Sequence, residues 1–156
     1  MAIAKKVGDF IADSGVEYHV INHEHSESAS RSAWAAHIKG GHVAKTVVLH
    51  DGERYLLGVV PATHRVELDT LGDILHCRLT LATESEVARL FDDCSVGADP
   101  PLGMAYGLPV VVDESLLEED DIFFEGGDHE SLVHVTHDGF EKLMKEAQHA
   151  RFSHHT

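Results

Sequence analysis

The stretch that most constrains the fold is residues 43–49, with the sequence VAKTVVL. It is dense in β-branched residues and too short for a typical helix, so it predicts a β-strand. Because strand side chains alternate between two faces, Lys45 is expected to share a face with Val43, Val47 and Leu49. An unpaired ammonium on an apolar face is costly. Either the lysine stem reaches solvent from an edge strand, or the amine is held at the mouth of a pocket to meet a negatively charged or polarised ligand.

The rest of the chain predicts one α+β domain, residues 1–156, with a mixed or antiparallel sheet. Further strands are expected at 16–21, 54–60, 78–82, 108–112, 121–124 and 132–135, and helices at 3–14, 29–38, 66–75, 84–91 and 140–147. Asp51-Gly52 predicts a hairpin, and Thr83 with Glu86 forms a capping-box pattern. Trp34 is expected in the core, and the tail at 149–156 is expected to be frayed.

Charge limits the kind of partner. The net charge is −15, and residues 90–141 contain no Lys or Arg, which argues against a DNA-binding protein or a non-specific nucleic-acid binder. Phosphate contacts should therefore be local and lie in the first half of the chain, around Lys45. No apolar run is long enough to span a membrane and no signal-peptide pattern is present, so a cytoplasmic location is expected.

The segment at residues 97–103, GADPPLG, is the least ordinary loop. Its two prolines fix the backbone and remove two N–H donors, which leaves Gly97, Ala98 and Asp99 to present N–H groups from a stiff segment. Such a segment can receive an oxyanion or a ligand carbonyl without reorganising. The alternative is a rigid surface connection without a binding role.

Other chemistries find little support in the sequence. The chain has 14 histidines, but His23-x-His25 is not a standard zinc spacing, so no metal site and no cofactor are expected. There is no Gly-x-Ser-x-Gly pattern, and Cys94 has no evident base partner, so no nucleophile array is predicted.

The ordered motifs resemble those of the YbaK family, which contains aminoacyl-tRNA deacylases related to the editing insertion domain of bacterial prolyl-tRNA synthetases. The motifs are VAKTVVL at 43–49, GVVPA at 58–62, GADPPLG at 97–103 and LPVVVD at 108–113. The likeness extends over about residues 18–140. It implies a mixed, barrel-like β-sheet flanked by helices.

The resemblance also implies roles for individual residues. Lys45 matches the family's functionally essential lysine, and Gly97 and Pro101 match the ends of its Gly-x-x-x-Pro loop, which includes Ala98 and lies against the ester and the terminal adenosine. His129, preceded by Asp128, matches a histidine that helps define the amino-acid pocket in the synthetase-type domains. Thr46 would line the same site. Leu102 departs from the pattern, because relatives often carry an aromatic residue there.

These correspondences imply an aminoacyl-tRNA deacylase that hydrolyses the ester of mischarged tRNA and so supports translation fidelity. An activated ester needs mainly orientation and stabilisation of a developing oxyanion, which a lysine and loop N–H groups can supply. The expected partner is the CCA end of the acceptor arm, with a synthetase as a further candidate. The alternative is a non-catalytic module of the same fold that binds an aminoacyl or nucleotide group.

Overall fold

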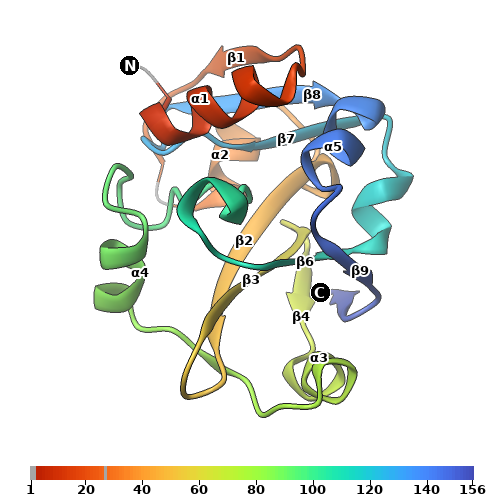
Figure 1. The fold of residues 1–156 in the computed structure, drawn as a ribbon. Coiled ribbons are helices and arrows are strands. Elements are labelled where there is room, and N and C mark those ends of the chain that lie inside the picture. The colour runs from red at the N-terminus through yellow and green to blue at the C-terminus, as the bar shows by residue number, and fades with distance from the viewer. Residues whose placement is uncertain (1–2, 27) are drawn as a thin grey trace.

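A computed structural model describes residues 3–26 and 28–156, and it shows a mixed β-sheet flanked by helices (Figure 1). The α-helices are α1 (Lys5–Ser14), α2 (Ala29–Ala35), α3 (Leu68–Leu75), α4 (Glu84–Leu90) and α5 (His137–Leu143). Short 3₁₀ helices are η1 (Gly40–His42), η2 (Gly103–Tyr106) and η3 (Glu114–Glu118). The strands are β1 (His19–Asn22), β2 (Val43–His50), β3 (Tyr55–Pro61), β4 (His64–Val66), β5 (Thr80–Leu81), β6 (Val110–Asp113), β7 (Asp121–Glu125), β8 (Ser131–Thr136), β9 (Gln148–Ala150) and β10 (Ser153–His155).

Strand β2 lies inside the main sheet, whose order is β1-β8-β7-β2-β3-β6-β9. It pairs antiparallel with β3 through the predicted hairpin, where Asp51 Oδ1 accepts the Arg54 N–H at 2.8 Å. On its other side it pairs parallel with β7 and, further along, antiparallel with β5. Lys45 therefore does not lie on an edge strand, and that explanation for an ammonium on an apolar face is wrong.

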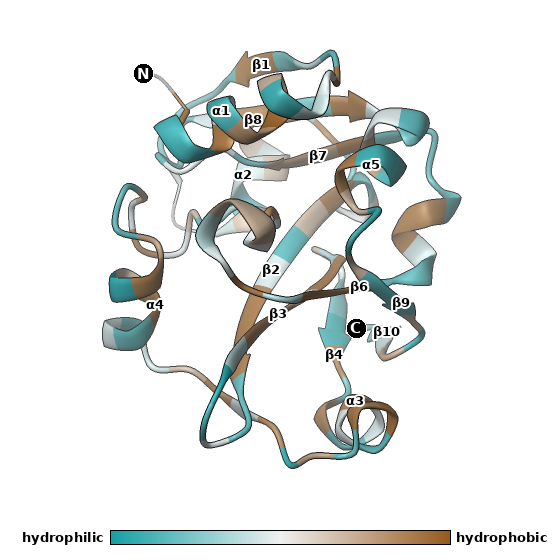
Figure 2. Ribbon diagram, viewed as in Figure 1, coloured by the Kyte–Doolittle hydropathy of each residue, from teal (hydrophilic) through white to brown (hydrophobic). Residues whose placement is uncertain are grey.

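The two faces of β2 bury different apolar clusters. Ala44 and Val48 belong to the largest cluster, which α1 and α5 cover. The opposite face carries Val43, which packs beneath α2, and Leu49, which packs with residues of α3 and the C-terminal tail. Figure 2 shows that much of β2 and β3 is hydrophobic, as expected for strands buried on both sides.

The C-terminal tail is ordered, and the expectation that it frays is wrong. Strand β9 adds to β6, and β10 pairs with β4 as a separate two-stranded sheet. Between them, Phe152 is 1% exposed, and its N–H donates to Asp113 Oδ1 at 2.9 Å. A buried aromatic ring and a paired backbone hold the tail in place.

The expectation that Trp34 lies in the core is also wrong. Its side chain is 82% exposed, because α2 approaches the sheet with its small residues, Ala29 and Ala33. The helix ends at Ala35 and not at Ile38, and His37 follows with a left-handed φ of 60°. Within residues 3–26 and 28–156, no helix has the length and apolarity needed to cross a membrane.

Candidate functional site

Lys45 lies between the two apolar clusters on its face of β2. Its Nζ donates a hydrogen bond to the carbonyl oxygen of His64 at 2.6 Å, and the residue is half-buried. Burial lowers the pKa of Lys45, and the positive charge of Arg65 lowers it further. The hydrogen bond uses one of the three ammonium donors, so the amine can still meet a ligand.

The pairing of β2 with β7 brings the backbone of Glu125 beside that of Lys45. Val43 pairs with Phe123 and Ala44 with Phe124, so Lys45 and Glu125 come next on the two parallel strands. Alternation puts both side chains on the face that α2 covers. Glu125 is 2% exposed, and the sequence analysis missed it. The available signal was a carboxylate at the end of the apolar run DIFFE, immediately before Gly126-Gly127.

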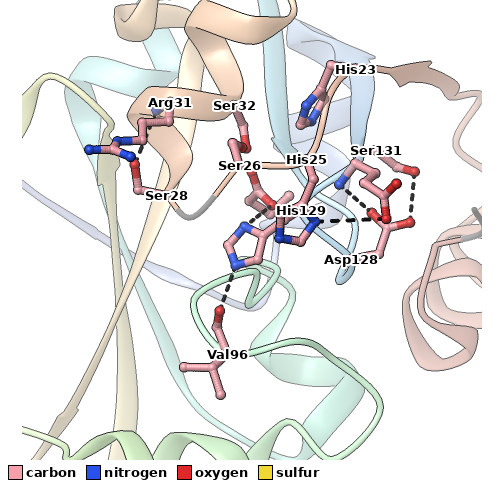
Figure 3. Close-up of polar contacts among 12 residues, drawn as sticks. His23, His25, Ser26, Ser28, Arg31, Ser32, Val96, Asp128, His129 and Ser131 are labelled. Atoms are coloured by element: carbon pink, nitrogen blue, oxygen red, sulfur yellow. Dashed lines mark hydrogen bonds and ion pairs between the residues drawn. The ribbon is translucent and has the colours of Figure 1, made fainter.

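The imidazole of His129 joins the β7–β8 turn to the proline-containing loop (Figure 3). Its Nε2 lies 2.6 Å from the carbonyl oxygen of Val96, which is the residue before Gly97. Because a carbonyl oxygen only accepts, Nε2 must carry the proton. The Ser95 N–H donates to the Gly127 carbonyl at 2.7 Å, which fixes the same two segments together. Residues 95–97, far away in the sequence, are thereby held against the end of β7.

The other ring nitrogen of His129 faces Glu125. Nδ1 lies 3.4 Å from Glu125 Oε2, and the two side chains are 2% and 3% exposed. Neither Nδ1 nor either Glu125 oxygen has a hydrogen-bond partner among the described residues. Burial raises the pKa of Glu125 to about 7, the negative charges of Asp128 and Asp99 add to that rise, and the nearby Ser32 hydroxyl opposes it. The site is therefore rich in buried acceptors.

The loop itself differs from the expectation that three N–H groups would be free. The Ala98 N–H donates to the Ser95 carbonyl at 3.0 Å, so a turn within the loop already uses it. Burial raises the pKa of the Asp99 carboxyl to about 6, against the smaller opposing effect of the Asp99 and Gly97 amides. These two amides therefore lie near the Asp99 carboxyl. Gly97 is exposed with φ 84°, a conformation that suits glycine, whereas Pro101 is buried.

Asp128 and Thr46 are the sequence neighbours of His129 and Lys45, but their side chains are directed elsewhere. Asp128 accepts hydrogen bonds from the Glu130 N–H at 2.9 Å and the Ser131 hydroxyl at 3.1 Å, so it stabilises the turn that carries His129. The Thr46 hydroxyl is buried without a partner among the described residues. Strand alternation puts Thr46 on the face of Ala44, opposite to Lys45.

The environment of Cys94 disfavours a thiolate nucleophile. Burial raises the pKa of its thiol to about 12; the Tyr106 hydroxyl opposes this effect and the Asp93 carboxylate adds to it. A thiol is nucleophilic mainly as its thiolate, so this group stays unreactive near neutral pH.

The chain is similar in sequence and in structure to aminoacyl-tRNA editing proteins. The sequence profile of the aminoacyl-tRNA editing domain matches residues 23–143. Among solved structures, the hypothetical protein APE2540 has a TM-score of 0.85 and 20% identity over 96% of this chain and 100% of that one. A candidate trans-editing enzyme for prolyl tRNA synthetase has a TM-score of 0.81 and 24% identity, with 96% of each chain covered. At these identities the likeness shows the fold alone. No curated protein matches the chain significantly.

Proposed function

Since the chain belongs to the aminoacyl-tRNA editing domain family, as the resemblance to YbaK proteins implied, we propose that it is an aminoacyl-tRNA deacylase that hydrolyses the ester of mischarged tRNA. Such an enzyme releases a wrong amino acid and leaves the tRNA free for correct charging. The proposed place of action is the cytoplasm, where aminoacyl-tRNA is used.

The observation that carries the proposal is the meeting of three distant segments at the end of β7. Lys45 comes from β2, His129 from the β7–β8 turn and Gly97 from the proline-containing loop. Strand pairing sets the first beside Glu125, and the His129–Val96 contact holds the loop at the same place. We propose that one ligand contacts the Lys45 amine, the His129 imidazole and this loop.

In the proposed mechanism these groups orient the ester and do not form a covalent intermediate. Lys45 offers its remaining donors to a phosphate or carbonyl oxygen and stabilises the negative charge that develops when water attacks. The loop from Gly97 to Pro101 packs against the terminal adenosine, and His129 borders the amino-acid side chain. Water supplies the nucleophile, and the ribose hydroxyl of the substrate orients it. The unreactive Cys94 is in keeping with this route.

The strongly acidic chain limits the RNA contact. With a net charge of −15, extensive contact with the phosphate backbone would be unfavourable, so the proposed contact is confined to the CCA end near Lys45. A synthetase that holds the rest of the tRNA is a proposed partner, because it would supply the affinity that this chain lacks.

The experiment that tests the proposal is a deacylation screen against a panel of mischarged tRNAs. The purified protein should accelerate loss of at least one amino acid well above the spontaneous rate, and the panel identifies which one. If the protein binds the charged acceptor ends without accelerating hydrolysis of any ester, it is a binding module of the same fold and not an enzyme.

A further inference from the structure

A group of buried hydrogen-bond acceptors near His129 has no hydrogen-bond partner among the described residues. Both oxygens of Glu125, Nδ1 of His129 and Oδ1 of Asp99 are buried and unpaired among the described residues. Glu125 Oε2 and His129 Nδ1 are 3.4 Å apart, and the charge of Asp99 contributes to the raised pKa of Glu125. Unsatisfied buried acceptors cost free energy, so a group of them indicates a ligand that donates hydrogen bonds.

The same region lacks a compensating cation from the protein. Within the described part of the chain, no Lys or Arg forms an ion pair with Glu125, Asp99 or Asp128. Asp128 is satisfied by its own turn, through Glu130 and Ser131. While the His129 ring is neutral, the negative charge of Glu125 and Asp99 has no cation of the described chain opposite it, and a bound cation can neutralise it.

We infer that Glu125, His129 and Asp99 form a subsite for a primary ammonium group, and that its ligand is the free α-ammonium of the aminoacyl ester. A primary ammonium has N–H donors and no acceptor, which suits the two neighbouring acceptors Glu125 Oε2 and His129 Nδ1, while the charge of Asp99 adds to the attraction. Because Nε2 of His129 donates to Val96, Nδ1 presents a lone pair in the neutral ring. The identity of the ammonium rests on the proposed function, whereas the subsite itself does not.

A metal ion fits these residues less well than an ammonium. In residues 3–26 and 28–156, the His, Asp and Glu ligand atoms that lie within 4.8 Å of one another belong to His137, Asp138 and Glu141, which are elsewhere on the surface. Glu125, His129 and Asp99 therefore do not converge on one metal ion, whereas an ammonium needs only the neighbouring Glu125 and His129 acceptors as direct contacts. Val96 and Gly97, which border the site, are both exposed.

The inference has a consequence for substrate class. Lys45 would meet the phosphate or carbonyl end of the ester, while Glu125 would meet its amino end. An aminoacyl group whose amine is acylated, or replaced by a hydroxyl, lacks the charge and the donors that the subsite needs. The protein should therefore act on free aminoacyl esters and discriminate against peptidyl, formylated and hydroxyacyl esters.

The test uses two nearly isosteric, non-hydrolysable probes, 3′-alanylamino-3′-deoxyadenosine and 3′-lactylamino-3′-deoxyadenosine, which differ in one ammonium for one hydroxyl. Binding of each is measured by calorimetry to the wild type, Glu125→Gln and Asp99→Asn. Glu53→Gln is the control, because Glu53 is an exposed carboxylate in the β2–β3 hairpin, away from the site. Thermal melting confirms that each variant is folded.

The wild type and Glu53→Gln should prefer the alanyl probe by about ten- to hundred-fold, as expected for charge-assisted hydrogen bonds. In Glu125→Gln this preference should largely disappear, through weaker binding of the alanyl probe alone, and Asp99→Asn should reduce it. Equal binding of both probes by the wild type, or a preference that survives in both variants, would overturn the inference. If the preference is present but no ester is hydrolysed in the deacylation screen, the subsite stands and the proposed enzymatic function fails.

Discussion

Glu125 Oε2 and His129 Nδ1 lie 3.4 Å apart in a part of the molecule from which water is almost fully excluded. The other nitrogen of the same ring holds the Val96 carbonyl. A protonation change at Glu125 therefore acts on a residue that joins the β7–β8 turn to the loop at Gly97. This relationship links the charge of the site to the stability of the fold.

The pH dependence of stability follows from the pKa of Glu125, which rises from 4.5 to about 7 because of burial, with Asp128 and Asp99 adding to the effect. Between those values the folded state holds a proton that the unfolded state has lost, so stability falls as pH rises through this range. The loss is at most about 3 kcal/mol. Glu125→Gln has no such proton and should lose less stability.

Urea unfolding at pH 5 and pH 8 measures this difference. The free energy of unfolding of Glu125→Gln, relative to the wild type, should increase between the two pH values. The constant cost of burying an amide cancels from the comparison, and Glu53→Gln, at an exposed hairpin position, should behave as the wild type does. Parallel pH profiles for the wild type and Glu125→Gln would show that this carboxyl is not perturbed by burial.

The ordered tail leads to a prediction about stability. Phe152 is 1% exposed and packs over Gly58 of β3, where an added Cβ would lie 3.3 Å from the ring. Phe152→Ala should therefore reduce the free energy of unfolding by about 3–5 kcal/mol. His149→Ala, at an exposed position in β9, is the control and should change it by less than about 0.5 kcal/mol. Denaturant unfolding measures both, and a small effect of Phe152→Ala would mean that the tail contributes little to the core.

The local parts of the fold could be predicted from the sequence because neighbouring residues determine them. The β-branched run gave β2, Asp51-Gly52 gave the hairpin, and Thr83 with Glu86 gave the capping box at the start of α4. The tail could not be predicted in this way. Its order depends on β4, β6 and Asp113, which are distant in the sequence. A short strand is predicted as coil when only its own residues are considered.

The candidate site was predictable only where residues carry a recognisable motif. Lys45, Gly97, Pro101 and His129 stand in such motifs, and their assigned roles stay predictions until they are tested. Glu125 was missed because a carboxylate at the end of a strand usually faces solvent. Its burial arises from parallel pairing with β2 and from cover by α2, and neither is visible in a short window of sequence.

The most direct test of the account is the rate at which Lys45→Met deacylates the mischarged tRNA that the screen identifies. Methionine keeps an unbranched apolar stem but removes the ammonium, and Lys145→Met, at an exposed lysine beyond α5, is the matched control. The account predicts that the rate falls about hundred-fold or more for Lys45→Met, with folding intact, and is unchanged for Lys145→Met. A wild-type rate in Lys45→Met would contradict it, because the ester would then be oriented and its charge stabilised without this amine.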